Sequence, residues 1–299
     1  MRVLLLGRNG QVGWELQRSL SSIGQLISLD ARSTEYCGDL FDLAGLSATI
    51  NRIRPHVIVN AAAYTAVDKA ESEPQRAKSV NSDAPKIIAE QAKLLGIFFV
   101  HFSTDYVFAG ETNKPRNECE EANPLNVYGA TKLAGEDAIR ASGCRHVILR
   151  TSWVHSARGH NFIKTILRLA QEKSEIEIVN DQFGAPTGAD LIADVCSHVI
   201  RSVYDKPDLD GLYHIAASGE TSWYQYARHI IDHLETNAQH IRLKLNTLAP
   251  IAATDYLSAA VRPKNSRLDT RKLQTTFGLT LPDWRVGVDR ALTEILERL

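Results

Sequence analysis

The sequence predicts an α/β fold in which a doubly wound, Rossmann-type parallel sheet is joined to a smaller mixed α/β lobe. Three observations favour this fold. Short apolar runs alternate with longer helical stretches over the first half of the chain. The short runs are apolar throughout, as is typical of strands that helices cover on both faces. A glycine-rich turn follows the first run directly and opens the first helical stretch.

The first half of the chain accounts for five strands and four helical stretches. The strands are expected at residues 3–6, 25–29, 57–60, 97–102 and 146–150, and the helices at 11–22, 42–53, 66–95 and 128–142. Asp42 is a predicted N-cap of the second helix, because its side chain can accept a hydrogen bond from the first turn. Pro74 and Pro85 should break the third stretch into two or three pieces.

After about residue 150 the alternation of strands and helices loosens. We therefore expect residues 1–150 to form a dinucleotide-binding domain and residues 151–299 to form mainly a substrate-binding lobe. Some strands that follow residue 150 are candidates to return to the first sheet. At 299 residues the chain is long enough for two such units.

Composition excludes several classes of protein. The chain has 34 basic and 35 acidic side chains and is 44% hydrophobic, so it can fold and has no global basic field to attract nucleic acid or membrane. The apolar run near the N-terminus is too short for a signal peptide or a spanning helix, which predicts a cytoplasmic protein. The four cysteines are far apart and are expected to be free thiols.

The glycine-rich turn has the spacing of a dinucleotide-binding loop. Glycines here would let the backbone approach a pyrophosphate at the N-terminus of the first helix. Asp30 closes the second strand, close to where an acidic residue should accept the ribose hydroxyls. An ordinary glycine turn is the alternative reading. The loop residues expected to bind the dinucleotide are Gly7, Asn9, Gly10, Gln11, Val12 and Gly13.

Two further features bear on the identity of the dinucleotide. Arg32 lies two residues beyond Asp30, where a guanidinium could pair with a 2′-phosphate, so we expect the protein to use both NADH and NADPH. Asp39 and Leu40 belong to a loop that would flank the adenine. That loop also reads as a simple turn followed by a helix cap.

Tyr128 and Lys132 are candidate catalytic residues. Their spacing places a phenol and an ammonium on one face of a helix. A nearby cation favours the phenolate and would lower the pKa of a tyrosine toward the working range. The alternative is an amphipathic helix with a surface Tyr and Lys. Of the nine tyrosines, however, only Tyr128 has a lysine four residues later.

Thr104 is the third candidate catalytic residue. It ends the fourth predicted strand, and open parallel sheets bind ligands at the carboxyl ends of their strands. Its hydroxyl could hydrogen-bond the substrate oxygen or Tyr128, while Ser103 could compete for the same role. The alternative reading is a turn that closes the strand.

In this order, the glycine loop, the threonine and the Tyr-Lys pair resemble the extended short-chain dehydrogenases/reductases. Five blocks are more specific and resemble the dTDP-4-dehydrorhamnose reductases: NAAAYTAVDKAE at 60–71, STDYVF at 103–108, PLNVYGATKLAGE at 124–136, RTSWV at 150–154 and RPKNS at 262–266.

The resemblance implies reduction of the C4 ketone of dTDP-4-dehydro-L-rhamnose by NADPH or NADH, the last step in making dTDP-L-rhamnose for cell-surface polysaccharides. It implies that Tyr128 donates a proton to the C4 oxygen. Lys132 would lower the pKa of Tyr128 and hold the nicotinamide ribose, and Thr104 would tune the hydrogen bonding. The residues implied to line the dinucleotide are Ala62, Ala63, Tyr64 and Thr65.

For the substrate, the resemblance implies contacts from Thr104, Asp105, Tyr128 and Trp153, with Trp153 covering the sugar. The alternative role of Trp153 is packing in the core. The segment from Gln182 to Thr187 is expected near the nucleotide end of the sugar. The family also implies a homodimer and a magnesium ion, for which Glu15 is a candidate ligand, although it serves equally well as surface charge.

A nucleoside diphosphate needs cationic partners. At least one residue of two basic groups should contact it, although solvated surface is the default for most of them. The groups are Arg145, Arg150, Arg158 and Lys164, and Arg262, Lys264 and Arg267.

Three other functions stay open. Another nucleotide-sugar reductase or an epimerase would share the Tyr-Lys pair, and a non-catalytic NAD(P)-binding regulatory subunit would share the fold. A dehydratase is disfavoured, because such enzymes typically carry Thr-Asp-Glu where this chain has Tyr106 after Asp105.

Overall fold

The computed structural model describes residues 1–238 and 241–298 and contains a six-stranded parallel sheet. The strand order is β10-β5-β4-β3-β1-β2. Their bounds are β1 (Arg2–Leu6), β2 (Gln25–Leu29), β3 (Val57–Asn60), β4 (Phe98–Thr104), β5 (His146–Thr151) and β10 (Gly211–His214). The five predicted strands are confirmed, and every pairing in this sheet is parallel.

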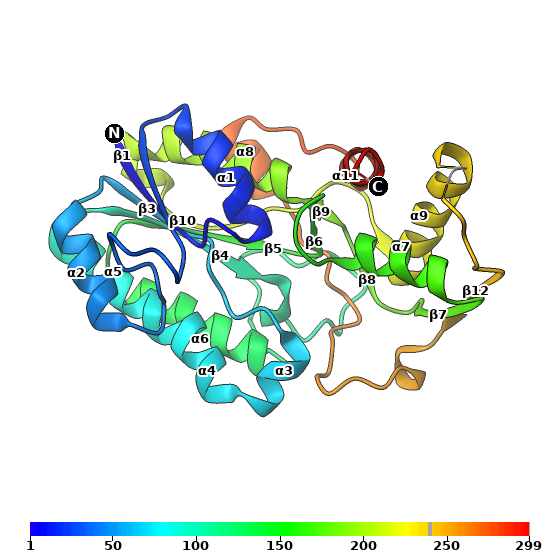
Figure 1. Ribbon diagram of the computed structural model, residues 1–299. Helices are drawn as coiled ribbons and strands as arrows, with labels where there is room; N and C mark the ends of the chain where they lie inside the picture. Colours follow the sequence, from blue (N-terminus) through cyan, green and yellow to red (C-terminus); the bar gives the residue numbers. More distant parts are fainter. Residues whose placement is uncertain (239–240, 299) are drawn as a thin grey trace.

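Helices cover both faces of this sheet (Figure 1). Side chains of β1, β3, β4 and β5 that point to one face form a core with helices α1 (Gln11–Ser21), α8 (Ala189–Tyr204) and α10 (Arg271–Phe277). Side chains that point to the other face form a second core with α2 (Leu43–Ile53), α5 (Ala84–Leu95) and α6 (Val127–Ser142). Since both faces are buried, the strands are apolar throughout, as the sequence predicted.

The helical stretch at 66–95 is broken as expected. Helix α3 (Val67–Ser72) is followed by α4 (Pro74–Lys78), a π-helical turn (Ser79–Asp83) and then α5. Pro74 stands in the first turn of α4, where the missing N–H has no intrahelical partner to lose. Pro85 instead directly follows the π-helical turn, which joins α4 to α5 without a break, so it distorts the helix there rather than ending it. The Asp42 side chain accepts from the Gly45 N–H, which confirms it as the N-cap of α2.

Segments beyond residue 150 build a second lobe and also return to the first sheet. Strand β10 and helices α8 and α10 belong to the first sheet and its cover. The second lobe has its own core, formed by α7 (Phe162–Glu172), α9 (Trp223–Asn237) and α11 (Trp284–Leu296) with β7 (Glu175–Val179) and β12 (Thr247–Ile251). Its short strands are β6 (Val154–His155), β8 (Phe183–Gly184), β9 (Thr187–Gly188) and β11 (Thr221–Ser222).

A buried ion pair fixes α6 against the sheet. Arg150 donates from Nε and Nη2 to the two carboxylate oxygens of Glu136, at 2.8 and 2.6 Å, and both side chains are almost fully buried. Separating the two would leave each buried charge without its partner, which is costly. The pair therefore favours the one register of α6 on β5 that keeps Arg150 and Glu136 together. Helix α6 carries Tyr128 and Lys132, so this register positions both side chains.

Among residues 1–238 and 241–298, no helix combines the length and apolar character that crossing a membrane requires. The four cysteines are free.

Candidate active site

The glycine loop packs directly on the chain that leaves β3. Gly7 has φ +88°, and a Cβ placed on it would lie 2.6 Å from the backbone nitrogen of Ala62. A Cβ on Gly13 would lie 2.0 Å from the Gly7 carbonyl oxygen. Neither position can hold a side chain, so these glycines let β1, α1 and the loop after β3 meet at one point.

Gly10 differs from the other two glycines. Its φ of −70° suits any residue, and the nearest atom to a Cβ there would be the Gly7 oxygen at 3.5 Å. A methyl group would instead project into the groove that Gly10 lines. No side chain caps α1 at Gly10, so the first N–H groups of the helix are free to bind an anion. This cradle of backbone N–H groups fits a pyrophosphate.

Asp30 lies in the adenosine end of the groove, a cavity of about 240 Å³. Its carboxylate accepts from Arg8 Nε at 3.0 Å and from Asn9 Nδ2 at 2.5 Å. Partial burial acts to raise its pKa, but hydrogen bonds from the Arg32 N–H and from Arg8 lower it below the usual value. The cavity is also lined by Asp39, Leu40, Phe41, Ala62, Ala63 and Tyr64.

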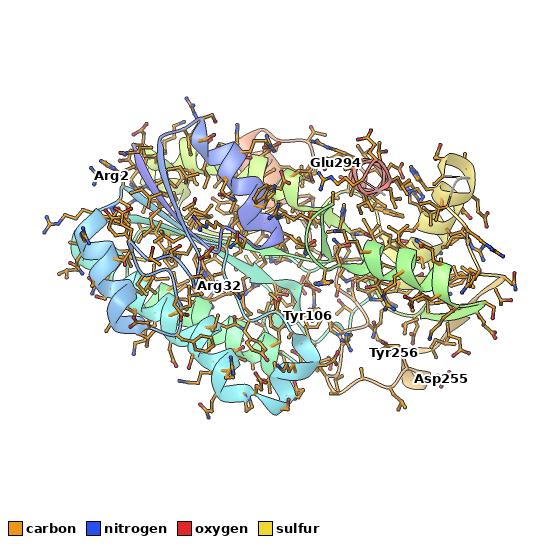
Figure 2. The ribbon with its side chains drawn as sticks, in the orientation of Figure 1. Arg2, Arg32, Tyr106, Asp255, Tyr256 and Glu294 are labelled. Carbon is orange, nitrogen blue, oxygen red and sulfur yellow. The ribbon has the colours of Figure 1, made fainter. Side chains whose placement is uncertain are left out.

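Arg32 is exposed and is not among the residues that line the described part of this cavity (Figure 2). Its backbone N–H, rather than its guanidinium, contacts Asp30, at 2.8 Å. The guanidinium that does reach Asp30 belongs to Arg8, in the glycine loop. The spacing of the glycines in that loop did not point to this arginine.

The candidate catalytic residues meet in an adjoining groove of about 590 Å³ at the carboxyl edge of the sheet. Tyr128, Lys132 and Thr104 line it together with Gly7, Gly10, Gln11, Val12, Ala61, Ala62, Ala63, Thr65 and Trp153. The structure thus brings the dinucleotide loop and the candidate catalytic side chains to one cavity.

Thr104 connects Tyr128 to a buried carboxyl group. Its Oγ1 donates to Asp105 Oδ1 at 3.1 Å and accepts from the Tyr106 N–H at 3.2 Å. The phenol of Tyr128 lies close enough for this hydroxyl to act on its pKa. Ser103 Oγ is buried and has no hydrogen-bond partner among the described residues. The hydroxyl next to Tyr128 is therefore that of Thr104.

The expected lowering of the Tyr128 pKa by Lys132 is not what the structure shows. Burial raises the pKa of Tyr128 to about 12, although the hydrogen bond with Thr104 acts to lower it. Burial likewise lowers the pKa of Lys132 to about 8, against the attraction of Glu136. At neutral pH the phenol is therefore protonated, which suits a proton donor.

The contacts of Lys132 explain why it does not act on the phenol. Its Nζ donates to the Phe102 carbonyl at 2.6 Å and lies 3.2 Å from His101 Nε2. Since the Ala62 N–H donates to Asn60 Oδ1, the amide nitrogen of Asn60 faces His101 Nδ1, at 3.2 Å. His101 thus lies between Asn60 and Lys132, and Lys132, whose pKa of about 8 is above neutral pH, is mostly protonated there.

Trp153 is held rigidly at the mouth of the groove. Its backbone is left-handed, with φ +47°, which is unusual for a bulky residue. Its ring stacks on Trp223 with centroids 3.6 Å apart and planes 15° apart. On the other side lies Gly184, where a Cβ would come within 2.6 Å of the Trp153 ring. Trp223 lines the groove as well, and no local pattern around it had pointed to the site.

A second cavity of about 880 Å³ continues from the groove into the second lobe. Tyr106 and Trp223 line both cavities, so the two are adjacent. The Tyr106 ring packs edge-on against that of Tyr128, with centroids 5.6 Å apart. Gln182 lines the second cavity, where the loop from 182 to 187 was expected to lie. The other lining side chains that carry charge are Lys173, Glu175, Glu177, Asp255 and Arg262.

Of the seven basic side chains predicted near a diphosphate, only Arg262 lines either cavity. Arg150 is buried in its ion pair with Glu136, as described above. Lys264 pairs with Asp181, and Arg267 pairs with Glu220. The guanidinium of Arg158 stacks over Trp14, 3.5 Å from the ring centroid, and Lys164 lies on α7 at a different surface cavity.

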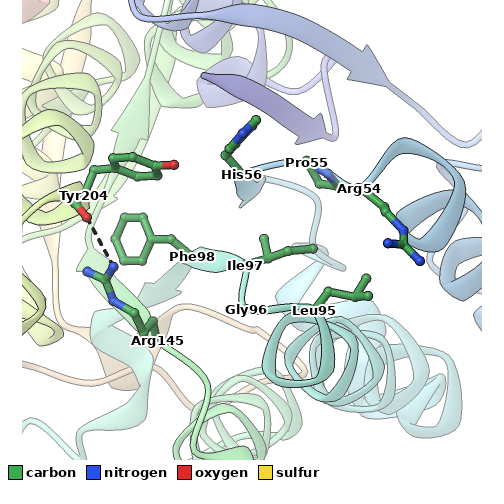
Figure 3. A pocket seen from close by; sticks show the side chains of 9 residues that line it. All are labelled: Arg54, Pro55, His56, Leu95, Gly96, Ile97, Phe98, Arg145 and Tyr204. Carbon is green, nitrogen blue, oxygen red and sulfur yellow. Dashed lines mark hydrogen bonds between the residues drawn. The ribbon is translucent and has the colours of Figure 1, made fainter.

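Arg145 lies at the opposite edge of the sheet, in a cavity of about 390 Å³ beside His56, Phe98 and Tyr204 (Figure 3). It donates to both carboxylate oxygens of Asp210 and to the carbonyls of Val203 and Tyr204. Its hydrogen-bonding capacity is therefore largely used, far from the carboxyl ends of the strands.

Glu15, the candidate metal ligand, lies beside other charged groups. Burial and then Asp190 raise its pKa, while Arg18 and Arg290 act to lower it. Among the described residues, no group of three or more His, Cys, Asp or Glu side chains could hold a metal ion. These residues therefore do not identify a magnesium site, and we derive no step that uses one.

Comparison with known proteins agrees with this arrangement. Residues 1–297 match the family model described as RmlD substrate binding domain. A dTDP-4-dehydrorhamnose reductase of Escherichia coli K12 is 52% identical over 295 residues, which cover 99% of this chain and 98% of that protein. This chain belongs to the dTDP-4-dehydrorhamnose reductase family.

Other members of the dTDP-4-dehydrorhamnose reductase family support the assignment. The Burkholderia thailandensis reductase is 42% identical and covers 100% of both chains. The crystal structure of the Bacillus anthracis reductase in complex with NADP is 33% identical, with a TM-score of 0.86, and covers 98% of this chain and 99% of that one. The fold and the family are thus the ones that the sequence predicted.

Two glycine substitutions separate binding from folding in the family's dinucleotide loop. Gly10→Ala should raise the Kd of NADP⁺ about tenfold and leave the melting temperature nearly unchanged, because the methyl group enters only the groove. Gly13→Ala should destabilise the fold by about 2 kcal/mol or more, because its Cβ meets a backbone oxygen. Calorimetric titration and thermal melting measure both. Equal loss of stability in the two variants would contradict this division.

Asp105 gives a pH dependence of stability. Burial raises its pKa to about 7, although hydrogen bonds from Ser266 and Thr104 act to lower it. Between pH 4 and 7 the folded protein therefore holds a proton that the unfolded chain has lost, so the free energy of unfolding should fall as the pH rises.

Relative to Asp105→Asn, the wild-type protein should lose up to about 4 kcal/mol over this interval. Urea denaturation at a series of pH values measures the difference. Parallel curves for the two proteins would show that Asp105 does not titrate in this range.

Proposed function

We propose that this protein reduces the C4 ketone of dTDP-4-dehydro-β-L-rhamnose with NADPH or NADH and so produces dTDP-L-rhamnose. The observation that carries the proposal is the meeting of Tyr128 with the glycine loop in one groove, which continues into a second cavity. A reductase of a sugar nucleotide needs these three features together.

The cofactor would lie along the glycine loop. Its pyrophosphate fits the cradle at Gly10 and the free N–H groups of α1, and its adenosine fits the cavity beside Asp30. When bound, a reduced nicotinamide supplies a hydride to the C4 carbon. The segment from Ala62 to Thr65 forms the wall that faces it.

Tyr128 donates the proton to the C4 oxygen. Its high pKa keeps it protonated at neutral pH, and the neighbouring Thr104 hydroxyl would help to orient it toward the substrate. Lys132, held by Phe102 and His101, presents its remaining hydrogen-bonding capacity toward the nicotinamide ribose. Asp105 and the stacked Trp153 hold the sugar, and the rigid Trp153 excludes water from one side of it.

The nucleoside diphosphate extends into the second cavity. Arg262 lines it together with Lys173, and the planar guanidinium of Arg262 meets the need of a diphosphate for a charged hydrogen-bond donor. Two expectations from the sequence stay predictions: a cytoplasmic location and a homodimer.

The proposal is tested by incubating the protein with NADPH and dTDP-4-dehydro-L-rhamnose and following the loss of NADPH absorbance. We expect turnover with either NADPH or NADH, and loss of about 10³-fold in kcat for Tyr128→Phe with little change in the Kd of NADP⁺. Wild-type protein that binds NADPH but does not oxidise it would favour a regulatory binding subunit. Isomerisation of the sugar without net oxidation would indicate an epimerase.

A further inference from the structure

Residues 253–262, which we call the strap, connect the second lobe to the first. The strap follows β12 and passes toward α3 (Figure 1). Asp255 and Tyr256, near its start, line the second cavity and lie at the second-lobe end of the molecule (Figure 2). Arg262, at its end, lines the same cavity. The strap therefore forms part of the wall that a bound sugar nucleotide would touch.

Asp68 of α3 fastens the far end of the strap. Its Oδ2 accepts from Arg262 Nη2 at 2.6 Å, and its Oδ1 accepts from the Ala260 N–H at 3.1 Å. Partial burial acts to raise the pKa of Asp68, but these hydrogen bonds lower it below the usual value. Both carboxylate oxygens of one side chain thus hold the same short stretch of chain.

The other end of the Arg262 guanidinium is unpaired. Its Nη1 is buried and has no hydrogen-bond partner among the described residues. Leaving a buried charged donor without an acceptor is costly. Burial raises the pKa of the neighbouring Tyr106, although Arg262 acts to lower it. Tyr106 lies at the junction of the two cavities. The Arg262 side chain, which is 23% exposed, therefore lines the second cavity with a guanidinium whose hydrogen-bonding capacity the described residues do not fully use.

A purely structural role does not account for this arrangement. The carboxyl of Asp68 is 47% exposed, and exposed ion pairs contribute little to stability. A similar pair occurs nearby, with Arg267 Nη1 2.7 Å from Glu220 Oε2. Neither of these two residues lines either cavity. What sets Asp68 apart is that its partner lines the second cavity and has hydrogen-bonding capacity that the described residues do not use.

We propose that Asp68 is a positioning residue for the substrate: it fastens the strap to α3 and holds the guanidinium of Arg262 at the second cavity for the diphosphate of the sugar nucleotide. This inference rests on the proposed function. Asp68 itself touches no substrate and acts through Arg262. It also joins the two lobes across the bound ligand, because α3 begins at Val67, which lines the catalytic groove.

The test compares Asp68→Asn with wild type. The asparagine can still accept from the Ala260 N–H but no longer pairs with the guanidinium. With NADP⁺ present, we expect the Kd of dTDP to rise about tenfold and that of dTMP, which lacks the second phosphate, by less than twofold. The KM for the sugar nucleotide should rise about tenfold, with kcat within twofold and the Kd of NADP⁺ unchanged.

Two controls show whether Asp68 acts through Arg262. In an Arg262→Gln background, Asp68→Asn should cause no further loss of dTDP affinity. Glu220→Gln, which breaks the comparable pair with Arg267, should leave the Kd of dTDP unchanged. Thermal melting verifies that each variant is folded, and Asp68→Glu, which keeps the charge, should recover part of the affinity if Asp68→Asn is unstable.

Equal weakening of dTDP and dTMP, or a tenfold effect that persists without Arg262, would overturn the inference. So would a Kd and KM within twofold of wild type. Failure of the proposed function is a separate result: the wild-type protein would then not oxidise NADPH with the dTDP-4-keto sugar, whatever the Kd values of the variants.

Discussion

The close backbone contact between Gly7 and Ala62 is the constraint on which the rest of the structure depends. A side chain at Gly7 would strike the chain that leaves β3, so only glycine permits β1 and β3 to end side by side with α1 starting between them. Strand β1 pairs with β2 on one side and β3 on the other, so the connections diverge here. That divergence opens the groove at the carboxyl edge of the sheet, where ligands bind in such folds.

A second consequence concerns the electrostatics of the groove. Because the carboxyl edge of β4 is buried, its polar groups change their ordinary behaviour: Tyr128 is a weaker acid, Lys132 a weaker base and Asp105 a weaker acid than in water. The protein does not activate the phenol with an adjacent cation. It keeps the phenol protonated and oriented, which is the form that reduction of a ketone requires.

Much of this was predictable from the sequence, and the remainder has physical reasons. The strands, the glycine loop and the Tyr128–Lys132 pair are local patterns, and local patterns are what a sequence shows directly. The contacts of Lys132 were not predictable, because His101 and Phe102 lie on another element. Trp223, Arg8 and the pairing of Arg262 with Asp68 join positions that are distant in the chain or absent from any consensus. Only folding brings Trp223 and Arg262 to one cavity, and only folding brings Arg8 to Asp30 and Asp68 to Arg262.

The central claim is that a single ligand runs from Tyr128 to Arg262 through both cavities. A crystal structure of the protein with NADP⁺ and dTDP-L-rhamnose tests this most directly. The account predicts the sugar O4 within hydrogen-bond distance of the Tyr128 hydroxyl, the ring against Trp153 and the diphosphate on the guanidinium of Arg262. A sugar in the groove with its diphosphate directed away from the second cavity, and Arg262 in contact with protein groups alone, would contradict it.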